Sequence, residues 1–400
     1  MSTARPDVIV VGAGPAGAAA AILLAEQGLH ALVLERGRRS RPKICGEYLS
    51  PEAGRVLDRL GVLKAVDSAG AVALRGMRIT APDGTMLTGR YHAVGAFRPY
   101  REHAMGVSRA VLDGALVERL RTLPVDFREG VRVSGVVVER GSVVGVDTVD
   151  RGGAVQTFRA PLVIAADGRA STVAHRLGCR HPHRLARMAL VTYVSGLADC
   201  RDFGEIYVDP PDYGILNPLA PGRINVSLVV PLAHAARWSD RLEHYFVARI
   251  RQLPHLARRL AGARREAPLQ AMGPLAYRVS PPREHGVLLV GDAAGFYDPF
   301  TGEGIYTALR GAELAVEAIV RAGRTGDVSA TAPAAYRRAR RAAFAEKERV
   351  TRALQLLIAH RRLANAAARW LARRPAALAA LLGVIGDFVP PRALLGALRG

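Results

Sequence analysis

One stretch near the start of the chain constrains its fold more than any other. Residues 7–36 read DVIVVGAGPAGAAAAILLAEQGLHALVLER: a β-branched run, a glycine turn, an alanine-rich segment and a second apolar run that ends in an acid. This order predicts a strand, a helix and a second, parallel strand. The GxGxxG spacing within such a unit is typical of dinucleotide-binding domains. The chain therefore opens with a Rossmann-like α/β unit.

Each residue type in this fingerprint has a physical role. Gly12 permits the tight turn, Gly14 lets the backbone approach a pyrophosphate, and Gly17 lets the helix pack closely on the strand. The amide groups at the start of the helix would face the phosphates, and Glu35 lies where an acid accepts from ribose hydroxyls. A glycine turn kept for packing alone is the alternative. The predicted cofactor-binding residues of this unit are Gly12, Gly14, Pro15, Ala16, Gly17, Glu35 and Arg36.

The composition excludes several other classes of protein. Of 56 basic residues only three are lysine, so the net charge of +21 suggests a coding bias towards arginine more than a surface for nucleic acid. The three cysteines form no CxxC pair, which argues against a disulfide framework and favours a reducing cytoplasm. Cys179, His181 and His183 lack the spacing of a zinc site, so we expect no metal. The apolar run at 376–386 is too short to span a bilayer.

Two later glycine-acid turns indicate how far the bound cofactor extends. Asp167 and Gly168 follow the apolar run PLVIAA, and Asp292 follows GVLLVG, so both acids lie at carboxyl ends of predicted strands. Open α/β sheets bind their ligands there. Asp292 suits a polyol hydroxyl, and Gly302 and Gly304 would let helix-terminal amides approach an electron-rich ring. A cofactor longer than an adenosine diphosphate is indicated, although an ordinary Asp-Gly turn also explains Asp167.

Further motifs support a resemblance to a known family. They are KICGEYLSP at 43–51, SRAVLD at 108–113, ADG at 166–168, DYGILNP at 212–218 and GDAAGFYDPFTGEGI at 291–305. With these motifs the chain resembles the flavoprotein superfamily of p-hydroxybenzoate hydroxylase, and within it the geranylgeranyl reductase-like branch. The resemblance implies a Rossmann-like, glutathione-reductase-type FAD-binding domain of α/β class, a β-sheet substrate domain and FAD as the cofactor.

The resemblance also implies roles for single residues. Arg109 would lie near the FAD phosphates and ribityl chain, Asp167 near the pyrophosphate and Asp292 on the ribityl chain. The set of cofactor-binding residues implied in the same way is completed by Cys45, Gly46, Gly291, Pro299 and Ile305. For catalysis we would mutate Cys45, Glu47 and Tyr48 first, although a cysteine often behaves as a compact apolar residue. Tyr213 is a candidate substrate contact, and core packing explains it equally well.

Two departures from the family patterns leave the reaction open. Geranylgeranyl reductases usually carry two glycines after their motif cysteine, whereas Gly46 is followed here by Glu47. Aromatic hydroxylases usually show a histidine and paired prolines after their Gly-Asp acid, whereas this chain has Gly295 to Pro299. The favoured expectation is an NAD(P)H-dependent monooxygenase that hydroxylates a hydrophobic aromatic or polyketide-like secondary metabolite, with an external reductase as the alternative electron source. Reduction of C=C bonds in an isoprenoid or lipid is the close alternative, and a basic nucleic-acid-binding protein is a distant third.

The pattern of apolar runs predicts how the domains are organised. The FAD-binding domain is expected from 1–70, 100–185 and 268–330, and a substrate-binding sheet from 71–99 and 186–267. Residues 76–91 predict a hairpin around Pro82-Asp83-Gly84. From 331 to 400 the chain is expected to be helical and rich in arginine. We expect this region to be a solvated face over the FAD domain, with peripheral attachment to an anionic membrane as the alternative.

Overall fold

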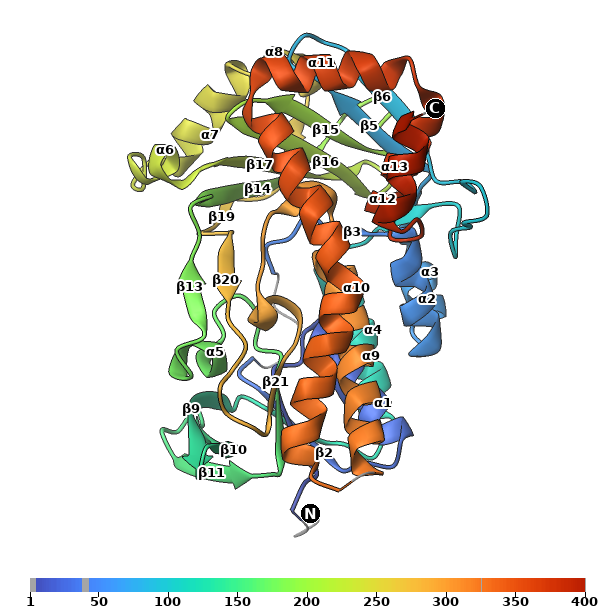
Figure 1. Cartoon of the computed structure of the whole chain (residues 1–400). Coiled ribbons are helices and arrows are strands. Elements are labelled where there is room, and N and C mark those ends of the chain that lie inside the picture. The colour runs from blue at the N-terminus through green and yellow to red at the C-terminus, as the bar shows by residue number, and fades with distance from the viewer. Residues whose placement is uncertain (1–4, 38–42, 325, 400) are drawn as a thin grey trace.

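The computed structural model describes residues 5–37, 43–324 and 326–399. Figure 1 shows two sheets, one above the other, with a long helix that runs from the lower sheet to the upper one. The lower sheet carries the N-terminal strand, and the upper one lies beneath the C-terminal helices.

The lower sheet is five-stranded and parallel, in the order β21-β12-β1-β2-β8. Its strands are β1 (Val8–Val11), β2 (Ala31–Glu35), β8 (Asp126–Glu129), β12 (Leu162–Ala165) and β21 (Val287–Leu289). Helix α1 (Pro15–Glu26) connects β1 to β2, so the predicted strand-helix-strand unit is confirmed. Because β12, β1 and β21 end at the same edge, the three glycine turns that follow them are brought together there.

Helices cover one face of this sheet and a small β-meander covers the other. The helices are α1, α4 (Arg109–Arg121), α9 (Gly304–Gly323) and α10 (Val328–Ala359), and their alanines and leucines form one core with the strands. Ser108 begins α4 as its N-cap, because its Oγ accepts from the amide of Val111 at 3.3 Å. The meander and its neighbour are β9 (Arg132–Glu139), β10 (Ser142–Val149), β11 (Val155–Arg159) and α5 (Thr172–Arg176).

Short elements connect the two sheets. They are β3 (Tyr48–Leu49), β4 (Val72–Leu74), β7 (Ala104–Gly106), α2 (Pro51–Arg59), α3 (Leu63–Ser68), β13 (Arg180–Pro182), β20 (Tyr277–Val279) and the single turns η1 (Gly291–Ala294) and η2 (Pro299–Thr301). Strand β7 pairs with both β3 and β4, and β13 pairs with β20. The loop after β21 therefore lies between the two sheets (Figure 1).

The upper sheet runs β18-β14-β17-β16-β15-β5-β6. Its strands are β5 (Gly76–Thr80), β6 (Met86–Arg90), β14 (Arg187–Ser195), β15 (Phe203–Asp209), β16 (Asp212–Ala220), β17 (Arg223–Pro231), β18 (Arg264–Arg265) and β19 (Gln270–Met272). The predicted hairpin and the pairing of the later strands into one sheet are confirmed. Strand β19 pairs with β14, so the sheet extends beyond 267, past the boundary expected from the sequence.

The two faces of the upper sheet pack differently because side chains alternate along its strands. Leu190, Leu216 and Leu228 pack under α7 and α8, whereas Val191, Ile215 and Val229 point to the lower sheet. The covering helices are α6 (Leu232–Ala236), α7 (Leu242–Arg251) and α8 (Pro254–Arg259). The second face is therefore available to a ligand held between the sheets.

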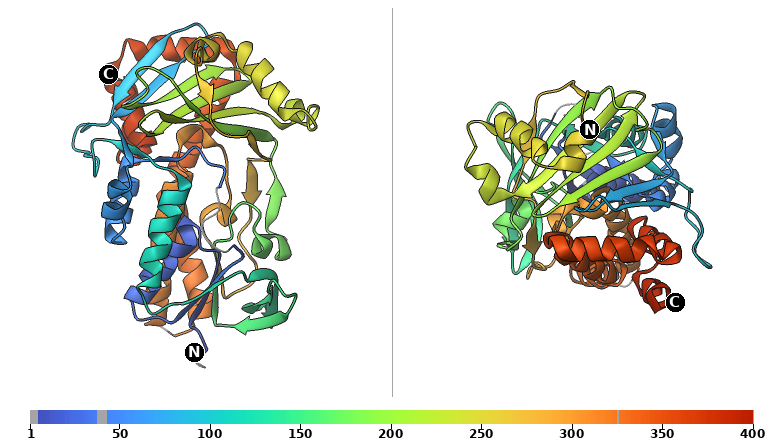
Figure 2. Two further views of the ribbon diagram at one scale, coloured as in Figure 1. Left: turned by 180° about the vertical axis from the view of Figure 1, so that it is seen from behind. Right: turned by 90° about the horizontal axis from the view of Figure 1, so that it is seen from above.

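The C-terminal region is helical, as expected, but only part of it is a solvated face. It consists of α10, α11 (Arg361–Ala372), α12 (Pro375–Ile385) and α13 (Pro391–Arg399), and Figure 2 shows α11 and α12 along one side of the upper sheet. Leu378, Leu382 and Ile385 of α12 belong to the core beneath that sheet, and Lys347 of α10 is buried. The expectation of an outer face was therefore too simple. Among the described helices, none is both long and apolar enough to cross a membrane.

Candidate functional site

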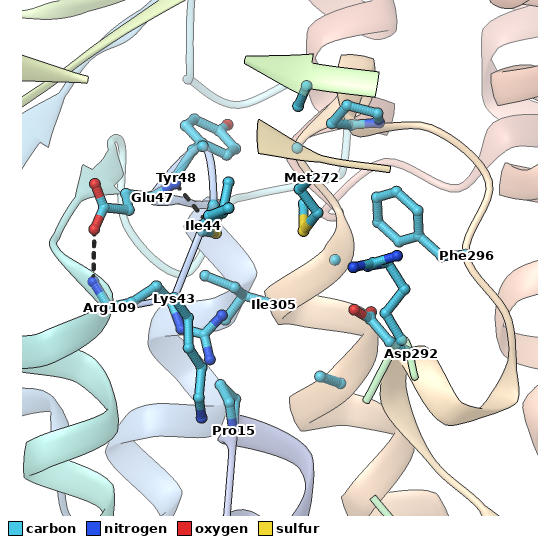
Figure 3. A pocket seen from close by; sticks show the side chains of 18 of the residues that line it. Pro15, Lys43, Ile44, Glu47, Tyr48, Arg109, Met272, Asp292, Phe296 and Ile305 are labelled. Carbon is cyan, nitrogen blue, oxygen red and sulfur yellow. Dashed lines mark hydrogen bonds between the residues drawn. The ribbon is translucent and has the colours of Figure 1, made fainter. Parts of the chain in front are cut away.

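A cavity of about 470 Å³ runs from the glycine turn of α1 to the lower face of the upper sheet. Figure 3 shows its lining, with Pro15, Lys43 and Arg109 at one side, Asp292 at another and Met272 above. The expected cofactor-binding residues line this cavity, except for Gly17 and Gly291. Turns that are more than 120 residues apart in sequence therefore surround one continuous space.

The first turn leaves the start of α1 open to a ligand. A Cβ on Gly12, whose φ is +93°, would lie 2.6 Å from the carbonyl oxygen of Ala166, and one on Gly17 would lie 1.9 Å from that of Gly12. These two glycines are thus required by packing. A Cβ on Gly14 would meet only the Lys43 ammonium, at 3.6 Å. The amide end of α1 therefore faces the cavity, as expected for a phosphate site.

Two cations are held at this end of the cavity by one buried acid. Asp113 accepts from Arg109 Nε at 2.9 Å and from Lys43 Nζ at 2.9 Å. Arg109 lines the cavity, and its predicted place near the FAD phosphates stays a prediction. Lys43 and Asp113 were not proposed from the sequence, although the spacing of Arg109 and Asp113 on one helix, i and i+4, was visible there. Both cations are available to neutralise a diphosphate.

Glu35 lies at the outer end of the cavity. Its carboxylate oxygens accept from the amides of Ala13 and Gly37, each at 2.8 Å. Each carboxylate oxygen can accept a second hydrogen bond. Glu35 is therefore fixed in place and can still accept from a ribose hydroxyl.

The two strand-end acids supply further acceptors along the cavity. Asp167 Oδ2 accepts from the amide of Thr172 at 2.7 Å, while Oδ1 is buried and has no hydrogen-bond partner among the described residues. Burial raises the pKa of Asp167. Burial also raises the pKa of Asp292, against the lowering effect of Arg109 and Arg169. An unpartnered buried acceptor is costly unless a ligand or water uses it, so Asp167 fits a polar group of an extended cofactor, and Asp292 lines the same cavity.

The part of the cavity that is lined by the predicted cofactor-binding residues is its cofactor half. The loop before α9 forms the inner end of this half. Gly302 has a φ of +67°, and a Cβ there would lie 2.6 Å from Cδ1 of Tyr48. Helix α9 then begins at Gly304, and no side chain among the described residues caps it. Its first amides and its positive dipole end are therefore free to stabilise negative charge on a ring.

The other half of the cavity is apolar. It is lined by Met77, Ile79, Val191, Ile206, Ile215, Val229, Met272, Phe296, Phe300, Leu382 and Ile385. Asn217 and Ser227 are the polar exceptions among the described lining residues of the upper sheet. Asn217 Nδ2 donates to the Gly46 carbonyl at 2.7 Å and Ser227 Oγ to Asn225 at 2.8 Å, whereas Asn217 Oδ1 is buried without a hydrogen-bond partner among the described residues. This half suits a hydrocarbon.

The three residues proposed for catalysis all line the cavity, and their roles there stay predictions. Burial raises the pKa of the Cys45 thiol, so it is neutral near pH 7. Glu47 Oε1 accepts from the Arg109 amide at 2.9 Å and Oε2 from Asn225 Nδ2 at 3.0 Å. The Tyr48 and Tyr91 hydroxyls lie 2.5 Å apart, and burial raises the pKa of both. Tyr48 is thus the group that best keeps a proton here.

Two other sequence features lie away from the cavity. Tyr213 is fully buried, packs edge-on against Phe300 and donates to Asp298, so core packing explains it. In the CRHPH segment, His181 Nε2 lies 3.0 Å from Ser280 Oγ, and His183 packs against Tyr297. Among the described residues, no group of three His, Cys, Asp or Glu is arranged to hold a metal ion.

The model of the FAD binding domain family matches residues 5–350. Digeranylgeranylglycerophospholipid reductase 1 of Methanococcoides burtonii is 30% identical over 78% of this chain and 75% of its own length. Menaquinone reductase of Mycolicibacterium smegmatis is 30% identical over 82% and 79%. Conditioned medium factor receptor 1 of Dictyostelium discoideum is 27% identical, and this chain spans 65% of its length.

Two solved structures share all or most of the fold. The flavin-dependent brominase Bmp2 covers 99% of this chain and 98% of its own, with a TM-score of 0.84 and 20% identity. The myxobacterial chondrochloren halogenase CndH covers 79% and 75%, with a TM-score of 0.72 and 26% identity. The resemblance and the fold class inferred from the sequence are confirmed.

Proposed function

The chain belongs to the FAD-binding-domain family of flavoproteins and is an FAD-dependent oxidoreductase, and from this premise we propose that it reduces a C=C bond of a long apolar, isoprenoid-type molecule. The observation that carries the proposal is the apolar half of the cavity, which continues directly from the loop at Gly302. Relatives that are 30% identical and named as reductases of a polyprenyl lipid and of menaquinone support the same substrate class.

The side chains of this protein have a defined share of such a reaction. FAD, when bound, supplies the two-electron transfer. The uncapped amides at the start of α9 would stabilise negative charge on the reduced cofactor, and the aliphatic wall would exclude water. The Tyr48 hydroxyl is protonated near pH 7, and because burial raises its pKa well above the ordinary value of 10, it gives up this proton only to a strongly basic atom. We assign to Tyr48 Oη the proton that the reduced carbon atom needs, with Tyr91 as its hydrogen-bonded neighbour.

The monooxygenase reading is the second candidate. It is favoured by the fold shared with oxygen-using flavoenzymes, among which the halogenase CndH is 26% identical. The aromatic side chains of Phe296 and Phe300 beside the ring end would also suit an aromatic or polyketide-like substrate. In this case the substrate gains one oxygen atom from O₂, and the other is released as water.

One experiment separates the two reactions. The bound FAD is reduced with one equivalent of dithionite under nitrogen, a geranylgeranyl lipid is added, and the mass of the product is measured by mass spectrometry. Reoxidation of the flavin without oxygen, together with a gain of two hydrogens in the product, is the expected result. A product that forms only after air is admitted, and that carries one added oxygen, would replace the reductase by the hydroxylase.

The electron donor is proposed to be NADH or NADPH. Anaerobic mixing of the holoenzyme with each nucleotide should bleach the flavin with at least one of them. If neither reduces the flavin within minutes while dithionite does, the donor is an external reductase.

We also propose that the C-terminal helices contact an anionic membrane, from which an apolar substrate would be collected. Leu356 and Leu363 are 67% and 48% exposed, and arginines surround them on α10 and α11. Helix α12, which follows α11, lines the apolar half of the cavity. Phosphatidylglycerol vesicles should bind the protein at low salt, as measured by co-sedimentation. The double substitution Leu356→Ser and Leu363→Ser should weaken this binding. No binding of the unaltered protein removes this proposal.

A further inference from the structure

A buried cluster of charges joins three segments that lie far apart in sequence. Lys347 of α10 is 7% exposed, and its Nζ forms a short ion pair with Asp387, which follows α12. The same ammonium donates to the carbonyl oxygen of Ile385 at 3.2 Å and lies 3.8 Å from Oε2 of Glu303, the N-cap of α9. One cation therefore contacts the start of α9 and the end of α12.

The neighbours of this cluster line both halves of the cavity. Gly302 and Gly304 flank Glu303 and line the cofactor half, whereas Leu382 and Ile385 line the apolar half. Thr351, one turn after Lys347 on α10, donates to Glu303 Oε1 at 2.7 Å. Helix α10 thus contacts the loop before α9 through Lys347 and Thr351, and it contacts the end of α12 through Lys347.

The identity of the cation suits this position. Only three of the 56 basic residues of the chain are lysine. An ammonium is compact and has three donors in a tetrahedral arrangement, whereas the planar fork of arginine matches a single carboxylate. Burial lowers the pKa of Lys347, but Asp387 and Glu303 raise it by more, so the ammonium keeps its charge.

We propose that Lys347 is a positioning residue that couples the ring-side loop at 302–304 to helix α12, so that occupation of the cofactor half closes the apolar half. The coupling rests on FAD binding, which the proposed function shares, and does not depend on which reaction follows. Because Lys347 contacts both Glu303 and Asp387, a cofactor that steadies the loop at 302–304 would, through Lys347, also steady the end of α12.

The test must separate coupling from simple destabilisation. Replacing Lys347 alone would leave two buried carboxylates with no cation between them, which is strongly destabilising. We therefore pair Lys347→Met with Asp387→Asn, which removes one of the two acids. Arg352→Met is the matched control, because Arg352 also lies on α10 and also forms an ion pair, but with Glu348 of the same helix.

Hydrogen–deuterium exchange of the α12 amides is measured in the full chain, with and without saturating FAD. In the unaltered protein and in R352M, FAD is expected to slow exchange of α12 by about tenfold, the size of a typical coupling between sites. In K347M/D387N, with an unfolding temperature close to that of R352M and FAD bound according to its visible spectrum, the FAD effect should fall below about twofold.

The results that overturn the proposal are equally specific. Unchanged α12 exchange on FAD binding in the unaltered protein would mean that the two halves are not coupled. An undiminished FAD effect in K347M/D387N would mean that Lys347 does not carry the coupling. If the double variant does not fold, Lys347→Arg is measured instead, and it should keep the fold with a reduced FAD effect. Absence of substrate turnover would touch only the proposed function, since no substrate enters the measurement.

Discussion

The hydroxyl of Tyr213 on β16 donates a hydrogen bond of 2.5 Å to Oδ1 of Asp298, the residue that begins the turn η2. The same oxygen accepts from the amide of Phe300 at 2.9 Å. Arg187 of β14 lies 3.7 Å from the other oxygen of Asp298. Asp298 thus fixes the loop that carries Pro299, Phe300 and Gly302 against the upper sheet, and so sets the distance between the cofactor half and the apolar half.

Asp298 should make the stability of the protein depend on pH. Burial raises its pKa to about 6, although Tyr213 and Arg187 lower it. The unfolded carboxyl ionises near pH 4, so between pH 4 and 6 the native state binds more protons than the unfolded state. The free energy of unfolding should therefore fall as pH rises through this window, by about 2–3 kcal/mol from this group.

The variant Asp298→Asn has no such group and should lose this part of the slope. Urea unfolding at pH 4, 5, 6 and 7 measures it against Asp240→Asn, whose carboxylate is exposed. The comparison also cancels Asp387, whose pKa burial raises to about 6 as well. Parallel curves for the two variants would show that Asp298 ionises normally.

Gly302→Ala should destabilise the ring-side loop for two reasons, backbone strain and a steric clash with Tyr48. Gly302 and Gly178 have φ angles of +67° and +64°, but only the Cβ at 302 meets a neighbour, Cδ1 of Tyr48, at 2.6 Å. We expect Gly178→Ala to cost about 1 kcal/mol of stability and Gly302→Ala about 1–3 kcal/mol more. FAD binding, followed by fluorescence, should weaken only in Gly302→Ala, and Tyr48→Leu should restore part of the loss. Equal costs at 178 and 302 would contradict the contact.

Glu47→Gln should act on stability and not on chemistry. Both Glu47 oxygens accept from donors, the Arg109 amide and Asn225 Nδ2, and a glutamine would turn its own NH₂ group towards one of them. The expected loss is about 1–3 kcal/mol in the free energy of unfolding. Turnover per bound FAD should stay within about twofold, since general acid–base roles are worth far more. Glu118→Gln, exposed on α4, is the control. A hundredfold loss of turnover at unchanged stability would instead make Glu47 catalytic.

Ile215→Asn should weaken the binding of an apolar substrate. Ile215 lies on the face of β16 that lines the apolar half of the cavity. A polar group there has to lose its water when a hydrocarbon enters, so KM should rise about tenfold. FAD content should not change, because the cofactor half is untouched, and Ile215→Leu should keep the KM of the unaltered protein. An unchanged KM in Ile215→Asn would place the substrate elsewhere.

Much of the cofactor half could be predicted because its signals are local. The βαβ unit at 7–36 is indicated by its apolar runs and its glycine spacing, and both follow from local backbone geometry. Asp167 and Asp292 could be placed near each other because each follows an apolar strand and parallel strands end at one edge. The strands of the upper sheet could be predicted because their apolar patterns are also local.

Other residues belong to the site through packing that no local pattern records. Gly291 looks like a ligand contact in sequence, yet a Cβ there would meet Ala16 of α1 and Ala308 of α9. Lys43 reaches the start of α1 only because Asp113, on another helix, holds it. Leu382 and Ile385 look like an ordinary apolar helix, and it is the path of α10 that brings them to the cavity.

The sequence alone thus determined the class of fold, the cofactor and the residues at strand ends, because backbone geometry and short spacings carry that information. The tertiary structure alone decided the shape of the apolar half, the burial of Lys347 and the hydrogen bond from Tyr213 to Asp298. The contacts of Lys347 with Asp387 and of Tyr213 with Asp298 join side chains 40 and 85 residues apart, and such contacts follow from how whole sheets and helices pack.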